Sequence, residues 1–367
     1  MITQEQVIEA LKNVIDPDFD KDIVTLGMVK DVVVDGKKVN FTVVLTTPAC
    51  PMKDMIHKAC VNAIIYYVDK EAEVNVNMTA KVTTKREAKG AGSVLSGVKN
   101  IIAVASGKGG VGKSTVAANL AVALALQGAK VGLLDADIYG PSIPMMFDVI
   151  DEKPLLEDIN GKTYMKPIEN YGVKMLSIGF FVTNAQAVVW RGPMASKAFQ
   201  QLINDAIWGD LDYMIIDLPP GTGDIQLSLV SSATITGAVV VSTPQNVALM
   251  DVRKAVSMFG HKDIHVPVLG IVENMAYFTP AELPNNKYYI FGKDGAKNLA
   301  DELKVPFLGQ IPIVQSICEA GDAGRPAVLQ KDTPQAKAFL ELASNVAQQV
   351  AIANHKKEEK QLETAQA

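Results

Sequence analysis

A glycine-rich segment carries the residue types that bind a nucleotide phosphate. It reads GKGGVGKS from Gly107 to Ser114, follows the apolar run IIAVAS and precedes the alanine-rich stretch STVAANLAVALALQG. Glycines let backbone N–H groups curl around phosphate oxygens, and the N-terminus of the following helix favours their negative charge. Lys113 is placed to reach the β- and γ-phosphates, and the Ser114 hydroxyl to hold Mg²⁺. The alternative is a glycine-rich turn with lysines by chance, but the strand before and the helix after favour a nucleotide site.

The residues predicted to contact the nucleotide follow one another along this loop. They are Gly107, Lys108, Gly109, Gly110, Val111, Gly112, Lys113, Ser114 and Thr115. Lys108 is a second lysine that the phosphate-binding pattern does not require. By itself it would be interpreted as a solvated surface side chain.

Two acidic segments follow later strands and complete the predicted site. Asp217 ends the apolar run DYMIID, where the carboxyl edge of an open α/β sheet binds ligands, so it is a candidate for the Mg²⁺ shell. The alternative for Asp217 is a helix cap or a turn. Asp135 and Asp137 lie in LLDADIYGPS. We expect Asp137 to orient the attacking water, whereas Asp135 fits a structural turn equally well.

The segments that must position these residues alternate between short apolar strands and helices from Ile101 onward. This alternation predicts a parallel sheet covered on both faces, and hence an α/β fold. The expected strands are IIAVAS (101–106), KVGLLDAD (130–137), YMIIDLPP (213–220), GAVVVSTP (237–244), VLGIVENM (268–275) and FLGQIPI (307–313).

A small α+β unit is predicted before this α/β domain. Thr3 and Gln6 form a possible capping box for a first helix, DGKK turns a hairpin, and PMKDMIHKACVNAIIYYV is a second helix before the strand AEVNVNMTAKV. The predicted organisation is a small domain over 1–85, a linker over 86–99, a P-loop NTPase domain over 100–353, and a charged, disordered tail over 354–367.

Composition narrows the class of protein. The net charge is −5 and 48% of the residues are hydrophobic, which is typical of a globular protein and gives no electrostatic reason to expect nucleic acid or an anionic membrane as partner. The cysteines Cys50, Cys60 and Cys318 are too few and scattered for a disulfide framework. There is no signal-peptide core and no apolar run long enough to span a bilayer. A cytoplasmic location is expected.

Several of these segments together resemble a known family. SGKGGVGKST resembles the deviant P-loop of the nitrogenase iron protein, MinD and ParA class. LLDADIYGPSIPMM, WRGPMASKAFQQ and DYMIIDLPPGTGDIQLSL resemble the Mrp/ApbC branch, whose members are ATP-dependent iron–sulfur cluster carriers. DPDFDKDIVTLGMV and TTPACPMKD resemble the small iron–sulfur assembly domain often fused to such ATPases. The resemblance covers nearly the whole chain.

The resemblance gives roles to Lys108 and Asn274. In this class the early lysine, here Lys108, crosses a dimer interface to the partner's nucleotide, as an arginine finger supplied in trans does. It therefore implies a homodimer. Asn274, in GIVENM, matches the residue thought to contact adenine, which an amide suits because it both donates and accepts hydrogen bonds. A strand-end cap is the alternative for Asn274.

One expected motif is missing. Most Mrp-type carriers have a C-x-x-C pair after the ENM segment, which in the dimer supplies four thiolates to a [4Fe–4S] cluster. This chain has no cysteine there. Cys50, which matches a cysteine of the assembly domain, and Cys318 are the remaining candidate ligands, each with an inert thiol as the alternative. For Cys50 we expect the helix N-terminus to lower the pKa. Cys60 is assigned to the core.

The motifs and the resemblance together imply a homodimeric, Mg²⁺-dependent ATPase that binds an iron–sulfur cluster, of the [4Fe–4S] type in the family, and transfers it to apoprotein acceptors. Two alternatives stay open. One is a nucleotide-switch scaffold in cluster assembly that holds no cluster. The other is a positioning ATPase of the ParA/MinD kind, which salt-sensitive binding to DNA or liposomes would reveal.

Overall fold

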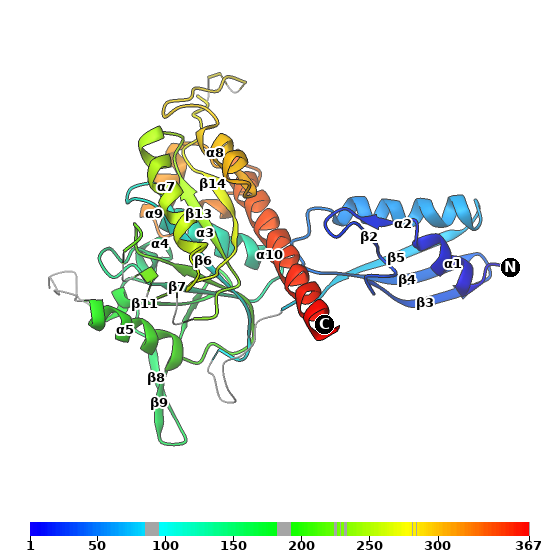
Figure 1. The fold of residues 1–367 in the computed structure, drawn as a ribbon, viewed down its shortest axis with the longest axis horizontal. Helices are drawn as coiled ribbons and strands as arrows, with labels where there is room; N and C mark the ends of the chain where they lie inside the picture. Colours follow the sequence, from blue (N-terminus) through cyan, green and yellow to red (C-terminus); the bar gives the residue numbers. More distant parts are fainter. Residues whose placement is uncertain are drawn as a thin grey trace.

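The computed structural model describes residues 1–84, 95–181, 192–223, 226–227, 229–230, 233–280, 282–283 and 285–366. It contains a small α+β domain and a larger α/β domain (Figure 1). The predicted linker, 86–99, falls mostly outside the described residues, which resume at Leu95. Among the described residues, no helix is both long and apolar enough to cross a membrane.

The small domain packs two helices on a three-stranded sheet of order β3-β4-β5. Thr3 caps the first helix and forms the predicted capping box with Gln6. The hairpin and second helix are also as predicted, and Cys60 is buried in this core. The elements are α1 (Gln4–Leu11), β1 (Ile15–Asp16), β2 (Lys21–Asp22), β3 (Val29–Asp35), β4 (Lys38–Leu45), α2 (Lys53–Tyr67) and β5 (Glu73–Ala80).

The α/β domain is built on an eight-stranded sheet within the described residues, of order β10-β11-β7-β12-β6-β13-β14-β15. All neighbours pair in parallel except β10 and β11. The strands are β6 (Val98–Ser106), β7 (Val131–Asp135), β10 (Ile168–Asn170), β11 (Val173–Ser177), β12 (Leu211–Asp217), β13 (Gly237–Ser242), β14 (Val268–Glu273) and β15 (Phe307–Gln310). A separate hairpin joins β8 (Leu155–Ile159) and β9 (Lys162–Lys166).

Helices cover both faces of the sheet, as the uniformly apolar strands require. One hydrophobic core lies beneath α3, α4, α9 and α10, and the other beneath α5, α7 and α8. The helices are α3 (Lys113–Leu126), α4 (Ile143–Met146), η1 (Ile178–Phe180), α5 (Gly192–Asn204), α7 (Asn246–Phe259), α8 (Gly295–Leu303), α9 (Gln315–Asp322), η2 (Ala327–Leu329) and α10 (Pro334–Gln366).

All six predicted strands are present, but two expectations need correction. The first strand begins at Val98 rather than Ile101. The tail predicted to be disordered from residue 354 is instead the last part of α10, which reaches Gln366. Contacts with the small domain hold this part: the ring of His355 packs edge-on against Phe19, and Glu359 pairs with Lys21 at 2.9 Å. A disordered segment was predicted because these stabilising groups lie more than 300 residues away in the sequence.

Candidate nucleotide site

The glycine loop connects β6 to α3, the two elements predicted to flank it. Gly112 is the N-cap residue of α3 and adopts a left-handed conformation with φ +80°. No side chain of the described residues caps the helix. The backbone N–H groups of its first turn are therefore free of side-chain partners and suited to an anion.

Two of the loop glycines are required by close packing. A Cβ on Gly107 would collide with the backbone of Asp251, on α7. A Cβ on Gly112 would collide with the amide of Asn274, in addition to the strain of its positive φ. The loop is thus pressed against two neighbouring elements, which fixes the path of its backbone.

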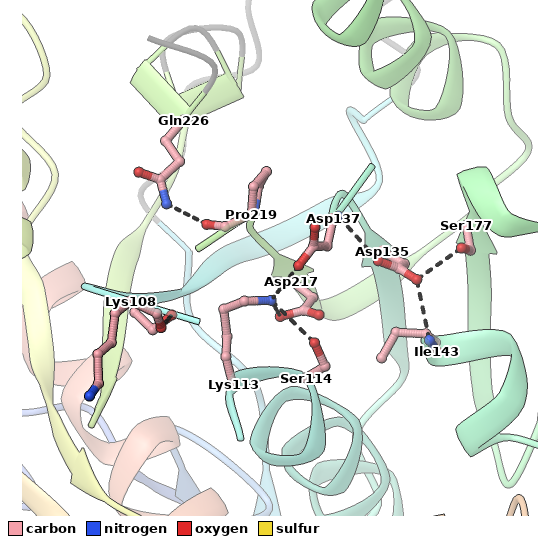
Figure 2. A network of polar contacts seen from close by, with 11 residues as sticks. Lys108, Lys113, Ser114, Asp135, Asp137, Ile143, Ser177, Asp217, Pro219 and Gln226 are labelled. Carbon is pink, nitrogen blue, oxygen red and sulfur yellow. Dashed lines mark hydrogen bonds and ion pairs between the residues drawn. The ribbon is translucent and has the colours of Figure 1, made fainter. Parts of the chain in front are cut away.

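The predicted charged residues meet at the carboxyl edge of the sheet. The Lys113 ammonium lies 2.6 Å from Asp217 Oδ1 and 3.7 Å from Asp137 Oδ2, and donates to Ser114 Oγ at 3.2 Å. Figure 2 shows these side chains converging from α3, β12 and the loop after β7. Lys113 and Asp217 are buried, with side-chain exposures of 6% and 0%.

The same donor set fits Mg²⁺. The ion prefers carboxylate and hydroxyl oxygens as ligands. Oxygens of Ser114, Asp137 and Asp217 surround one positive charge in this structure, the ammonium of Lys113. Asp217 Oδ2 is buried and has no hydrogen-bond partner within the part of the chain that the structure describes. An unpaired buried carboxylate oxygen is costly, so a metal ligand role accounts for it.

Asp135 and Asp137 have separate surroundings. Asp135 is fully buried and accepts hydrogen bonds from Ser177 Oγ at 2.9 Å, from Ile143 N and from Asp137 N. Burial raises the pKa of Asp135 to about 7, and the charge of Asp217 adds to this. The contacts match the structural alternative considered for Asp135. Asp137 faces the lysine and stays the candidate for orienting water.

Burial also raises the pKa of Asp217, while the charge of Lys113 opposes the rise. The ammonium therefore favours the ionised form that a metal ligand needs. The sequence had left open a capping role for Asp217, and the buried ion pair with Lys113 favours the site role instead.

Lys108 does not join this cluster. Its side chain points away from Lys113 (Figure 2). Among the described residues it makes no ion pair within 4.0 Å, although its carbonyl accepts from Ser106 Oγ at 2.9 Å. The orientation leaves the ammonium free for a group outside this copy of the chain, and the trans role stays a prediction.

Asn274 is buried beneath the loop rather than on an open base-binding surface. Its amide donates to the carbonyl of Val111 at 2.9 Å, and 6% of the residue is exposed. The side chain thus supports the glycine loop, a role that sequence reasoning missed. Contact with adenine stays a prediction.

Gln226 is a further residue that the sequence analysis missed. It is buried, its amide nitrogen donates to the Pro219 carbonyl, and its Oε1 has no hydrogen-bond partner among the described residues (Figure 2). It therefore braces the loop that follows Asp217. The signal available was a single amide within the apolar run DIQLSLV.

The candidate thiols are not assembled into a site. All three cysteines are free, with Cys50 half-buried in the small domain and Cys318 exposed on α9. No group of three metal-ligating side chains of the His, Cys, Asp or Glu type occurs in the described part of the chain.

The expected lowering of the Cys50 pKa is wrong. Burial raises it to about 11, and the charges of Asp18 and Asp16 add to the rise. Hydrogen bonds from the backbone at Met52 and Lys53, at the start of α2, lower it by less. Desolvation of a thiolate thus outweighs the helix N-terminus.

Family models match both domains. Residues 97–347 match the model described as NUBPL iron-transfer P-loop NTPase, and residues 4–78 match that of an iron–sulfur cluster assembly protein. The chain belongs to the iron-transfer P-loop NTPase family. The resemblance inferred from the motifs is confirmed.

Relatives with names in iron–sulfur cluster transfer cover between 71% and 96% of the chain. A protein of Synechocystis sp. named iron–sulfur cluster carrier protein is 45% identical over 354 residues, covering 96% of this chain and 99% of the relative. The iron–sulfur cluster transfer protein NUBPL of Dictyostelium discoideum is 47% identical over 263 residues, covering 71% of this chain and 80% of the relative.

Solved structures match the α/β domain. A nucleotide-binding protein of Archaeoglobus fulgidus in complex with ADP is 40% identical, with a TM-score of 0.57 over 66% of this chain and 91% of that one. The cell division ATPase MinD of Pyrococcus furiosus is 26% identical, with a TM-score of 0.50 over 67% of this chain and 98% of that one. The predicted fold class is confirmed.

Proposed function

We propose that the protein is an ATP-hydrolysing iron–sulfur cluster carrier that works as a homodimer and delivers its cluster to apoprotein acceptors. The observation that carries this proposal is the cluster in which the buried Lys113 ammonium contacts Ser114, Asp137 and Asp217. A relative that matches 96% of the chain is named an iron–sulfur cluster carrier protein. ADP in the Archaeoglobus fulgidus neighbour supports an adenine nucleotide.

Each residue of this cluster has a separate role in ATP hydrolysis. Lys113 leaves Asp217 to contact the β- and γ-phosphates, while the uncapped first turn of α3 donates backbone hydrogen bonds. Ser114 and Asp217 would hold Mg²⁺, which would neutralise charge on the phosphates. Asp137 accepts a hydrogen bond from the attacking water and orients it.

Completion of the site requires a second copy. Lys108 points away from its own cluster, and we assign its ammonium to the γ-phosphate bound by the partner. A cation supplied in trans stabilises charge that develops in the transition state. Hydrolysis thereby becomes linked to dimer formation, which suits a switch that holds and releases cargo.

The iron–sulfur cluster is the cargo, and one chain does not bring its candidate thiol ligands together. Cys318 is exposed, so two copies could each present one thiol. Cys50 is half-buried with a raised pKa, and iron must displace its proton. We propose these two cysteines as the ligands in this chain, since Cys60 is fully buried in the core of the small domain.

Anaerobic reconstitution with iron and sulfide tests the cargo. We expect visible thiolate-to-iron absorption and bound iron in the native protein, and the loss of both in Cys50→Ala/Cys318→Ala. Cys60→Ala is the matched control and should keep the cluster. If the double variant still binds iron and transfers it to an acceptor, ligation by these thiols is wrong.

A nucleotide-switch scaffold that holds no cluster is the second candidate. It is favoured by the absence, within the described residues, of any ready group of three metal ligands. A protein that stays colourless after reconstitution, yet hydrolyses ATP and accelerates cluster assembly on an acceptor, would establish this function instead.

A further inference from the structure

One loop of the small domain is built into the α/β domain. It runs from Thr47 to Cys50, between β4 and α2. Thr47 and Ala49 are 1% and 3% exposed, and Ala49 belongs to the hydrophobic core beneath α3. Because this loop carries Cys50, the thiol is attached to a segment that cannot shift without disturbing the larger domain.

The loop contacts the far end of the helix that begins at the nucleotide site. A Cβ built on Gly128, just beyond the C-terminus of α3, would lie 4.0 Å from Cβ of Pro48. The residues of α3 from Val116 to Leu124 are all buried, and the helix is about 20 Å long at 1.5 Å per residue. A close-packed helix moves as a rigid body and transmits displacement along its length.

The loop also contacts the far end of the strand that carries Asp217. The hydroxyl of Tyr213, near the start of β12, donates to Thr47 Oγ1 at 2.9 Å, and both side chains are buried. Four residues later, β12 ends at Asp217. Lys113 on α3 and Asp217 on β12 form the central ion pair of the nucleotide site. The far ends of α3 and β12 therefore both contact the Thr47–Cys50 loop.

The junction leaves room for movement. A cavity of about 470 Å³ adjoins the loop and is lined by Pro51, Gln127, Leu340, Glu341, Ser344 and Asn345. Gln127 is the C-cap residue of α3, and its amide nitrogen donates to the Leu340 carbonyl and to Ser344 Oγ, both at 3.1 Å. Its Oε1 is buried and has no hydrogen-bond partner among the described residues. A shift of α3 would exchange these two hydrogen bonds with α10, and the cavity gives the side chain room to do so.

We propose that nucleotide binding at the P-loop exposes Cys50 through α3 and β12. The phosphates draw Lys113 away from Asp217, both elements adjust, and the Thr47–Cys50 loop moves out of its packed position. The half-buried thiol then becomes accessible to cargo or to an acceptor. This inference rests on the proposed nucleotide binding, but not on any identity of the cluster ligands.

The test is the rate at which Cys50 is alkylated by N-ethylmaleimide in the full-length, cluster-free Cys318→Ser protein, where Cys60 stays buried. Rates are compared without nucleotide, with Mg²⁺ and ADP, and with Mg²⁺ and a non-hydrolysable ATP analogue, each at saturation measured by calorimetry. We expect the ATP analogue to accelerate alkylation about fivefold or more, the lower range of typical coupling between sites.

Variants at the junction identify the route. Tyr213→Phe removes only the hydroxyl that contacts Thr47, so it should reduce the acceleration while nucleotide affinity is kept. Tyr164→Phe, in the β8–β9 hairpin far along the chain from the junction, is the matched control and should behave as the parent. Thr47→Val breaks the same hydrogen bond from the other side, should Tyr213→Phe fold poorly.

The outcomes separate this inference from the proposed function. Nucleotide that binds without changing the alkylation rate, or that slows it, overturns the exposure of Cys50 and leaves the ATPase intact. Acceleration that persists fully in Tyr213→Phe and Thr47→Val overturns the route through β12. Absence of nucleotide binding overturns the proposed function, and this inference with it.

Discussion

The nucleotide site and the thiol positions differ in how much of each is assembled by one chain. At the carboxyl edge of the sheet, Lys113 contacts Asp217 and lies beside Ser114 and Asp137, all within 4 Å. Cys50 and Cys318 lie on separate elements, one half-buried and the other exposed. A parallel sheet gathers the ends of its strands at one edge, whereas nothing in the fold gathers the thiols. We infer that a single chain suffices to bind the nucleotide, whereas hydrolysis needs Lys108 of a second copy and cargo binding needs a second protein surface.

The substitution Lys108→Ala should impair ATP hydrolysis without disturbing the fold of the chain that carries it. We expect ATP hydrolysis to fall by on the order of 10³-fold, the scale of a cation supplied in trans, with nucleotide affinity nearly unchanged. Phosphate release and calorimetry measure the two. Lys130→Ala, at an exposed position, is the control.

Mixing variants sharpens the test of trans action. Lys108→Ala lacks the donated lysine, and Asp137→Asn lacks the residue assigned to water. A mixed dimer contains one complete site if Lys108 acts across the interface, so the mixture should recover part of the activity. No recovery, with dimers confirmed by light scattering, would contradict the trans role.

The substitution Asp217→Asn should lower hydrolysis by about 10²-fold, since it removes a carboxylate ligand from the Mg²⁺ that would offset the charge on the phosphates. The Mg²⁺ concentration needed for half-maximal rate should rise as well. Both follow from steady-state phosphate release over a Mg²⁺ titration. Asp301→Asn, on the exposed surface of α8, should leave both values unchanged. A rate and Mg²⁺ dependence equal to those of the parent would remove Asp217 from the site.

The substitution Asn274→Ala distinguishes support of the loop from contact with the base. It leaves the buried Val111 carbonyl without its partner, so the free energy of unfolding without nucleotide should fall by about 1–3 kcal/mol. Urea denaturation measures this, with the exposed Asn298→Ala as control. An unchanged stability, together with a lost preference for ATP over GTP, would show instead that Asn274 serves the base alone.

The pH dependence of Cys50 alkylation tests whether burial controls the reactivity of this thiol. A pKa raised to about 11 leaves little thiolate near neutrality, so the rate in Cys318→Ser should rise about tenfold per pH unit up to about pH 10. A thiol with the ordinary value of 9.0 would level off earlier. Stopped-flow alkylation, with free cysteine as reference, gives the profile; a plateau at pH 9 would show that burial does not control Cys50.

Local patterns were enough to predict six strands of the eight-stranded sheet in the described part of the chain, and the capping box of α1. They failed where distant segments decide the outcome. The end of α10 is helical because it contacts Phe19 and Lys21, and neither contact is visible in the charged sequence of the tail. The edge strand β10 and its neighbour β11 were missed as well; they are short, and β10 runs antiparallel to β11.

The sequence by itself determined the chemistry of the nucleotide site. The glycine loop joins a strand to a helix and the aspartates follow later strands, and the ends of parallel strands lie at one edge of the sheet, so these residues meet there. Only the tertiary structure decided which groups are buried and what they contact. It placed Asp135 within a hydrogen-bonded turn, Asn274 beneath the loop and Cys50 against the core. Burial and long-range contact depend on how the domains pack, and so they set the pKa of Cys50 and join it to α3 and β12.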